Sequence, residues 1–196
     1  MLKIIPLGGL GEIGLNMMVI EYGDTGFIID AGLMFPEDYM LGIDIVIPVM
    51  DYIKQSETNI VAVILTHAHE DHIGAIAHLW PQLECKIFAT PFTAVLIKEK
   101  FKEKNIDITS YLKVVQLNGN INLEPFKIEY ITLTHSILEP NGLRIETPGG
   151  VILHTGDWKI DPEPLIGEKT NSNRLKEIGK EGVLAMICDS TNVFSM

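Results

Sequence analysis

A continuous apolar run, Asn59–Thr66, is followed at once by the sequence His67-Ala68-His69-Glu70-Asp71-His72. An apolar run without alternation is typical of a strand that is buried on both faces. From Asp71 to Trp80 the apolar side chains have helical spacing, and the pattern stops before Pro81. The order of strand, polar loop and helix is typical of an α/β fold, and it places three imidazoles and two carboxylates in the loop.

The rest of the chain predicts a layered α/β fold with β-hairpins and a few helices. A hairpin is expected around Gly23-Asp24, because apolar runs flank this turn-forming pair. A helix is expected from Pro91 to about Lys104, since proline is favoured in a first helical turn, and another over about Ser172–Gly179. Strands are expected at 2–7, 16–22, 25–30, 59–66, 86–90, 112–117, 126–136, 143–148, 149–157 and 182–190, the last of them buried.

The net charge of −11 bears on the kind of partner. Taken alone it argues against a nucleic acid, because phosphate binding favours a basic surface. Acids that bind a divalent cation count toward this net charge although the local site is positive, so RNA is not excluded. No apolar run approaches the roughly 18 residues that span a bilayer, and Pro6 and the following glycines interrupt any signal-peptide core. A cytoplasmic protein with no membrane partner is therefore expected.

Two features resemble other kinds of site. Cys85 and Cys188 lie far apart without CxxC spacing, which argues against a disulfide framework or a thiolate zinc site and favours two buried free thiols. Gly9, Gly11 and Gly14 satisfy the GxGxxG pattern of dinucleotide-binding loops, but a hairpin pattern rather than a helix follows them. We interpret them as turn glycines.

The histidine-rich loop has the composition of a metal site. Zinc prefers imidazole and carboxylate ligands, and a catalytic site keeps one coordination position for water. His67 and His69 are two residues apart and point to the same side if the backbone is extended. Asp71 and His72 lie where the helix begins and can turn back toward the same cavity. One short loop can thus present two pairs of ligands to two neighbouring cations.

Two later segments repeat the pattern of a candidate ligand at the end of a strand. His135 follows an alternating apolar run, and Asp157 follows another run after a short turn. A site for two cations needs a further imidazole and a carboxylate that can bridge, so both residues are candidate ligands. We expect His78 and His154 to be structural and Glu70 to face solvent.

Six segments carry a family resemblance over nearly the whole chain: PLGGLGEIGLNM, IDAGLMFPE, THAHEDHIGA, THSI, HTGDWKID and CDSTN. Together they resemble the metallo-β-lactamase superfamily and, within it, the ribonuclease J family of the β-CASP branch of RNA-processing nucleases. The resemblance implies an α/β fold of the layered αββα sandwich type. It also implies a ligand set in which His67, His69 and His135 hold one zinc ion, Asp71 and His72 hold a second, and Asp157 bridges the two.

Two further acids match motifs of this family. Asp30 corresponds to an acid that supports the ligand loop from behind the metal ligands, a recognised need of metal sites. Asp189 corresponds to the first acid of the β-CASP motifs, which implies a place near the site. The alternative for Asp189 is an ordinary turn at the end of a strand.

The resemblance implies a zinc-dependent hydrolase of single-stranded RNA. Its substrates would be mRNA and rRNA precursors, cleaved as a 5′-to-3′ exonuclease and as an endonuclease. Water activated by two zinc ions would attack phosphorus, with Asp71, His72 and Asp157 as the catalytic residues and manganese as an alternative metal. The full-length protein is expected to be a homo-oligomer.

The C-terminus bears on domain organisation. The chain stops at Met196 soon after a predicted strand, and it lacks the further histidine that completes the second zinc site in this family. We therefore expect residues 1–196 to be the N-terminal part of an incomplete metallo-β-lactamase catalytic domain, which ends where the β-CASP domain would begin. This fragment alone is expected to be weakly active or inactive.

Two other functions remain open from the residues alone. The same ligands would hydrolyse a thioester or a lactone, so a small-molecule hydrolase of the same fold is one alternative. The other is a metal-binding scaffold without catalysis, which the acidic composition favours.

Overall fold

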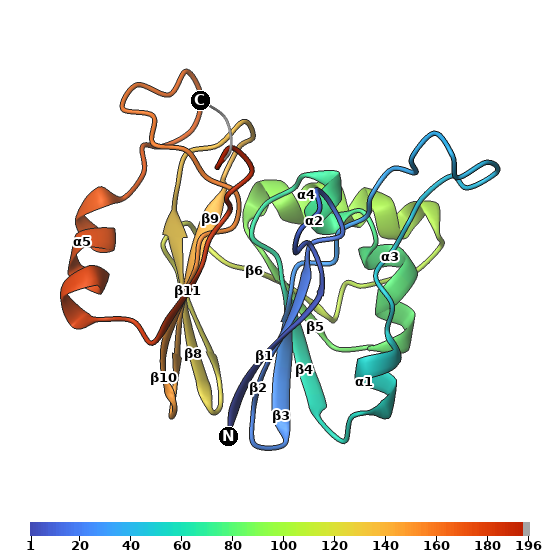
Figure 1. Ribbon diagram of the computed structural model, residues 1–196, viewed down its shortest axis with the longest axis horizontal. Coiled ribbons are helices and arrows are strands. Elements are labelled where there is room, and N and C mark those ends of the chain that lie inside the picture. The colour runs from blue at the N-terminus through green and yellow to red at the C-terminus, as the bar shows by residue number, and fades with distance from the viewer. Residues whose placement is uncertain (194–196) are drawn as a thin grey trace. The chain divides into compact units, whose positions relative to one another are not determined.

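A computed structural model describes residues 1–193, which form two compact units (Figure 1). The first unit comprises residues 1–114, and the second begins at residue 115. Each unit is built on one β-sheet that mixes parallel and antiparallel pairs, with helices of its own. None of the described helices is long and apolar enough to span a membrane.

The first sheet has six strands in chain order. Its first three strands run antiparallel, and the later ones run parallel. The hairpin predicted around Gly23-Asp24 is present, with Tyr22 paired to Thr25 and with Gly23 at a φ of 69°, which suits glycine. The strands are β1 (Leu2–Gly8), β2 (Met17–Tyr22), β3 (Thr25–Ile29), β4 (Asn59–Ile64), β5 (Lys86–Ala89) and β6 (Leu112–Val114).

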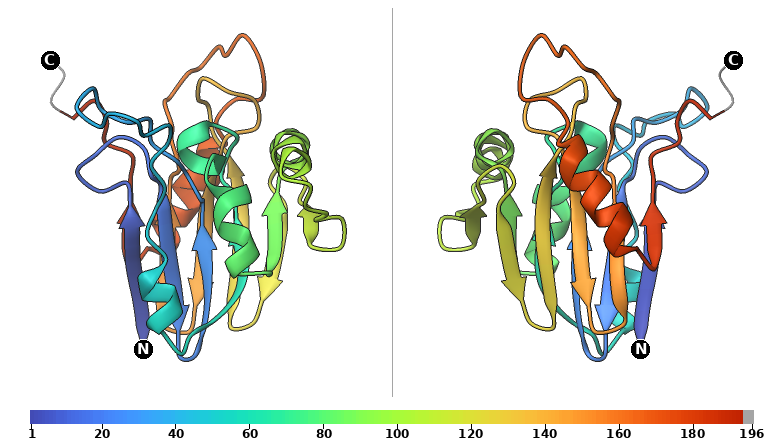
Figure 2. Two further views of the ribbon diagram at one scale, coloured as in Figure 1. Left: turned by 90° about the vertical axis from the view of Figure 1, so that its right-hand side faces the viewer. Right: turned by 90° about the vertical axis from the view of Figure 1, so that its left-hand side faces the viewer.

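The histidine-rich loop emerges from β4, which pairs with β3 on one side and β5 on the other. The last three residues of β4 are fully buried, as predicted for this apolar run. Helices α1 (Asp51–Gln55) and α3 (Ile76–Leu79) lie on one face of the sheet (Figure 2, left). Helix α4 (Pro91–Glu103) packs against β5 and β6, and it confirms the helix predicted from Pro91.

The helix predicted over Asp71–Trp80 is wrong as one element. It is divided into α2 (Glu70–Ile73), α3 and a 3₁₀ turn (Trp80–Gln82). The backbone N–H of Ala75 donates to the carbonyl of Ala31 at 2.9 Å instead of continuing the helical ladder. Tertiary hydrogen bonds thus replace the helical bond, and they hold the ligand loop against the segment that follows β3.

The second unit has a sheet in the order β11-β10-β9-β8-β7, with α5 (Ser172–Glu181) on one face (Figure 2, right). Ile178 of α5 packs with Ile131 and Leu133 in the buried cluster between helix and sheet. The strands are β7 (Asn120–Leu123), which was not predicted, β8 (Phe126–Thr132), β9 (Asn141–Thr147), β10 (Gly150–His154) and β11 (Ala185–Ile187).

The last strand corrects one expectation. It was predicted to be buried over 182–190, but β11 is short, and none of its residues is fully buried. Among the described residues it lies at the edge of the sheet, where it pairs with β10. Cys188, just after it, is exposed, so the expectation of two buried thiols is also wrong. Cys85 is buried as expected, and burial raises the pKa of its thiol to about 12.

Candidate metal centre

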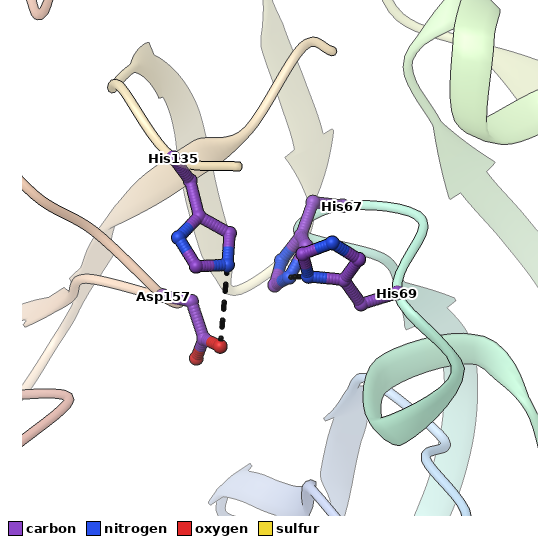
Figure 3. Close-up of side chains that lie close together, drawn as sticks. All are labelled: His67, His69, His135 and Asp157. Atoms are coloured by element: carbon purple, nitrogen blue, oxygen red, sulfur yellow. Dashed lines mark hydrogen bonds and ion pairs between the residues drawn. The ribbon is translucent and has the colours of Figure 1, made fainter. Parts of the chain in front are cut away.

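The ligand loop of the first unit brings two imidazoles together. His67 is fully buried, and His69 is the residue immediately before α2, with extended backbone. The Nε2 atom of His67 lies 3.2 Å from Nδ1 of His69, and the rings meet edge to face (Figure 3). Two nitrogen atoms therefore converge in the way expected from the spacing of the two histidines.

Asp30 holds the base of this loop. It follows β3 with a φ of 60°, a left-handed conformation that aspartate tolerates better than most residues. One carboxylate oxygen accepts the backbone N–H of Thr66 at 2.8 Å, and the other accepts the Thr66 hydroxyl at 2.9 Å and Nδ1 of His72 at 2.7 Å. Because a carboxylate accepts, Nδ1 of His72 carries the proton, and Nε2 presents a lone pair.

Thr66 fixes the tautomer of His67 in a similar way. Its hydroxyl donates to Asp30 and therefore accepts from Nδ1 of His67, 3.0 Å away. The Nε2 atom of His67 is then left with a lone pair, as a metal ligand requires. Sequence reasoning missed Thr66, although its place between the strand and the first histidine is a signal that was available.

Asp71 and His72 form a second pair at the start of α2. A carboxylate oxygen of Asp71 lies 3.6 Å from Nε2 of His72, the atom with the lone pair. His72 is buried, and Asp71 is partly exposed. The two side chains thus turn toward each other at the start of α2.

The second unit brings His135 and Asp157 together. Nε2 of His135 lies 3.6 Å from a carboxylate oxygen of Asp157, shown by the dashed line in Figure 3. The residues beside them hold the two segments to each other. Lys159 donates its backbone N–H to the carbonyl of Thr134 at 2.8 Å, and the Thr134 hydroxyl donates to the carbonyl of Lys159.

The donor spacing within each pair tests whether a metal ion fits. Ligand atoms at about 2.0–2.2 Å from a tetrahedral zinc ion lie roughly 3.3–3.6 Å from each other. The Asp71–His72 and His135–Asp157 pairs are at 3.6 Å, within this range, and the His67–His69 pair is at 3.2 Å, just below it. A separation of 3.6 Å is too long for a hydrogen bond and suits two ligands of one cation. The donor pairs therefore fit a divalent metal.

Asp189 occupies a turn after β11. Its carboxylate accepts the N–H of Thr191 at 2.9 Å and the hydroxyl of the same residue at 2.6 Å. Its own N–H donates to the hydroxyl of Thr155 at 3.1 Å, two residues before Asp157. The carboxylate thus has the geometry of an ordinary strand-end turn, and a role near the site stays a prediction.

Three other residues have local roles. His78 is exposed, and its pKa is lowered by partial loss of solvent and by the charges of Lys104 and Lys100. Nδ1 of His154 accepts the N–H of Gly156 at 3.0 Å, in the turn before Asp157. Glu70, expected to face solvent, is half exposed and forms an ion pair with Lys100 at 2.6 Å.

Comparison with known proteins shows the family to which this chain is related. Residues 10–169 match the metallo-beta-lactamase superfamily. The chain is 43% identical over 197 residues to a ribonuclease J from Sinorhizobium meliloti and 46% identical over 191 residues to one from Helicobacter pylori. Both alignments cover 97% of this chain but 35% and 28% of the relatives, so the chain spans about a third of their length.

A solved structure confirms the predicted fold class. The metallo-beta-lactamase fold protein YhfI from Bacillus subtilis superposes with a TM-score of 0.54 and 18% identity, over 80% of this chain and 63% of that protein. The family match extends over most of the sequence, and the fold agrees with it. This chain therefore belongs to the metallo-β-lactamase superfamily.

Proposed function

We propose that this chain is the N-terminal part of the catalytic domain of a metal-dependent ribonuclease, ending where a β-CASP domain begins. The relatives named ribonuclease J support RNA as the substrate. The observation that supports metal binding is the distance of 3.2–3.6 Å between the ligand atoms of each donor pair. Each pair consists of residues that match the ligand motifs of the family. The proposed substrate is single-stranded RNA, cleaved both from the 5′ end and internally. The natural protein is proposed to act in the cytoplasm as a homo-oligomer.

The proposed ligand roles follow the pairs. His67, His69 and His135 would hold one zinc ion, Asp71 and His72 would hold a second, and Asp157 would be available to both. Bound zinc or manganese would supply an activated water and offset negative charge on the phosphate.

Two residues of the chain orient the histidine ligands so that their Nε2 lone pairs are available to a metal ion. Asp30 keeps the proton of His72 on Nδ1, and Thr66 keeps that of His67 on Nδ1. In both rings the Nε2 atom is thereby left to act as a ligand, and the same hydrogen bonds set the orientation of the ring. The acidity of the chain does not oppose this function, because Asp30, Asp71 and Asp157 contribute to the net charge within a region that binds cations.

Metal binding and substrate choice are tested separately in the intact natural protein. Calorimetric titration with Zn²⁺ is expected to show two bound ions, and His67→Ala with His69→Ala is expected to remove one of them. A 5′-labelled single-stranded RNA should be cleaved by the wild type and not by the double variant. Cleavage of a thioester or lactone panel without RNA cleavage would instead establish a small-molecule hydrolase, and metal binding without any turnover would establish a scaffold.

A further inference from the structure

Asn16, which follows the glycine-rich segment, contacts both residues of the second ligand pair. Its side-chain Nδ2 lies 3.1 Å from Nε2 of His72 and 3.3 Å from a carboxylate oxygen of Asp71. It also donates to the backbone carbonyl of Asp71 at 3.1 Å. One amide group therefore meets the two atoms proposed to bind a cation and the backbone that carries one of them.

The orientation of this amide follows from its partners. A backbone carbonyl only accepts, so the nitrogen rather than the oxygen of Asn16 faces Asp71. The backbone of Asn16 is held as well, because its N–H donates to the Asp71 carbonyl at 3.1 Å and its C=O accepts from Gly32 at 2.9 Å. Side chain and main chain thus hold the same point of the ligand loop.

Two glycines, Gly9 and Gly32, allow this approach. Gly9 has a φ of 81°, and a Cβ placed on it would lie 2.6 Å from Oδ1 of Asn16. A Cβ on Gly32 would lie 1.6 Å from the carbonyl oxygen of Asp71. Any larger residue at either position would displace the amide or the loop. Gly9, the first glycine of the GxGxxG-like segment, therefore lets that segment pass close to the Asn16 side chain.

We propose that Asn16 is a positioning residue for the second cation of the proposed metal centre, acting through Asp71 and His72. The inference rests on the proposed function. The amide has two hydrogens for three acceptors. With the His72 lone pair given to a cation, both hydrogens have acceptors on Asp71, one on its backbone and one on its carboxylate. Asn16 thereby orients the carboxylate without competing for the metal.

The test is metal affinity resolved by site. Substitution of a residue that orients metal ligands typically costs about 10–100-fold in affinity. In the intact natural protein, Asn16→Ala is expected to weaken binding of the second Zn²⁺ by roughly this factor and to leave the first unchanged, because the side-chain amide of Asn16 donates to Asp71 and meets His72, the two residues proposed to hold the second ion. The matched control is Asn122→Ala, which replaces an exposed asparagine in β7. This variant should bind both ions as the wild type does.

A second measurement separates positioning from a general structural role. RNA turnover by Asn16→Ala should fall in kcat and recover as Zn²⁺ or Mn²⁺ is raised, because the defect is occupancy. If the variant folds poorly, Asn16→Leu keeps a side chain of similar size, lacks the donor hydrogens without adding a charge and should show the same selective loss. Equal weakening of both sites, unchanged affinity at both, or a kcat that added metal does not restore would each overturn the inference. A wild-type protein that binds no cation would overturn the proposed function itself.

Discussion

The Nδ1 atom of His72 lies 2.7 Å from a carboxylate oxygen of Asp30, and each side chain is only 2% exposed. The two residues are 42 positions apart in sequence, so this contact joins the end of β3 to the ligand loop after β4. Asp30 also accepts two hydrogen bonds from Thr66. One buried carboxylate therefore sets both the position of the loop and the tautomer of a candidate ligand.

Removal of this carboxylate should destabilise the fold as well as the site. Asp30→Ala removes the buried carboxylate that accepts from the N–H and hydroxyl of Thr66 and from Nδ1 of His72. Breaking such a buried network costs about 3–5 kcal/mol, so the free energy of unfolding in urea should fall by roughly that amount. Asp107→Ala is the control, because Asp107 accepts the same two groups of Thr109 but is exposed. Equal losses from both variants would contradict the role of burial.

The Thr66 hydroxyl should be needed for the His67 tautomer. Thr66→Val preserves the shape of the side chain but removes the donor to Asp30 and the acceptor for His67. We expect Zn²⁺ affinity at the site that includes His67 to fall about 10–100-fold. Thr66→Ser, which retains the hydroxyl, should bind metal nearly as well as the wild type. Isothermal titration of the two variants checks this, and a Ser variant as weak as the Val variant would argue against the hydroxyl.

The second unit should lose stability in acid through an ion-pair network on α5. The hydrogen bond from Arg174 holds the pKa of Glu181 below its ordinary value of 4.5, and Arg144 with Lys127 does the same for Glu146. A carboxyl with a depressed folded-state pKa contributes stability that is present above 4.5 and is lost as pH falls through the folded-state value.

The measurement for this network is the urea midpoint as a function of pH. The urea concentration at the unfolding midpoint of the wild type should decrease as the pH is lowered below 4.5. Glu181→Gln should make this pH dependence weaker, and it should lower the stability at pH 7. Glu163→Gln is a suitable control, since Glu163 is an exposed acid outside this network. A Glu181→Gln curve parallel to that of the wild type would show that the network does not contribute.

The two cysteines should differ in reactivity. Burial raises the pKa of Cys85 to about 12, so almost none of it is thiolate at pH 8, whereas Cys188 is exposed. Iodoacetamide at pH 8 should therefore alkylate Cys188 alone in the folded chain and both cysteines in urea, as peptide mass spectrometry can establish. Rapid modification of Cys85 in the folded chain would contradict its burial.

Several parts of the fold were predictable because their signals are local. The run 59–66 identified the buried strand β4, and Pro91 identified the start of α4. The candidate metal ligands His67 and His69 could also be predicted, since they are two residues apart on an extended segment. The helix over 71–80 was not predictable in its true form, because the N–H of Ala75 bonds to Ala31 rather than within the helix.

The sequence by itself determined which donors exist and that they follow strands, because a periodicity of two or of 3.6 residues depends only on neighbouring side chains. Only the tertiary structure decided which groups hold those donors. Asn16 contacts Asp71 from 55 residues away, and Asp30 contacts His72 from 42 residues away. The physical reason is that such hydrogen bonds form only after the strands have paired and the glycines have let the backbone segments approach.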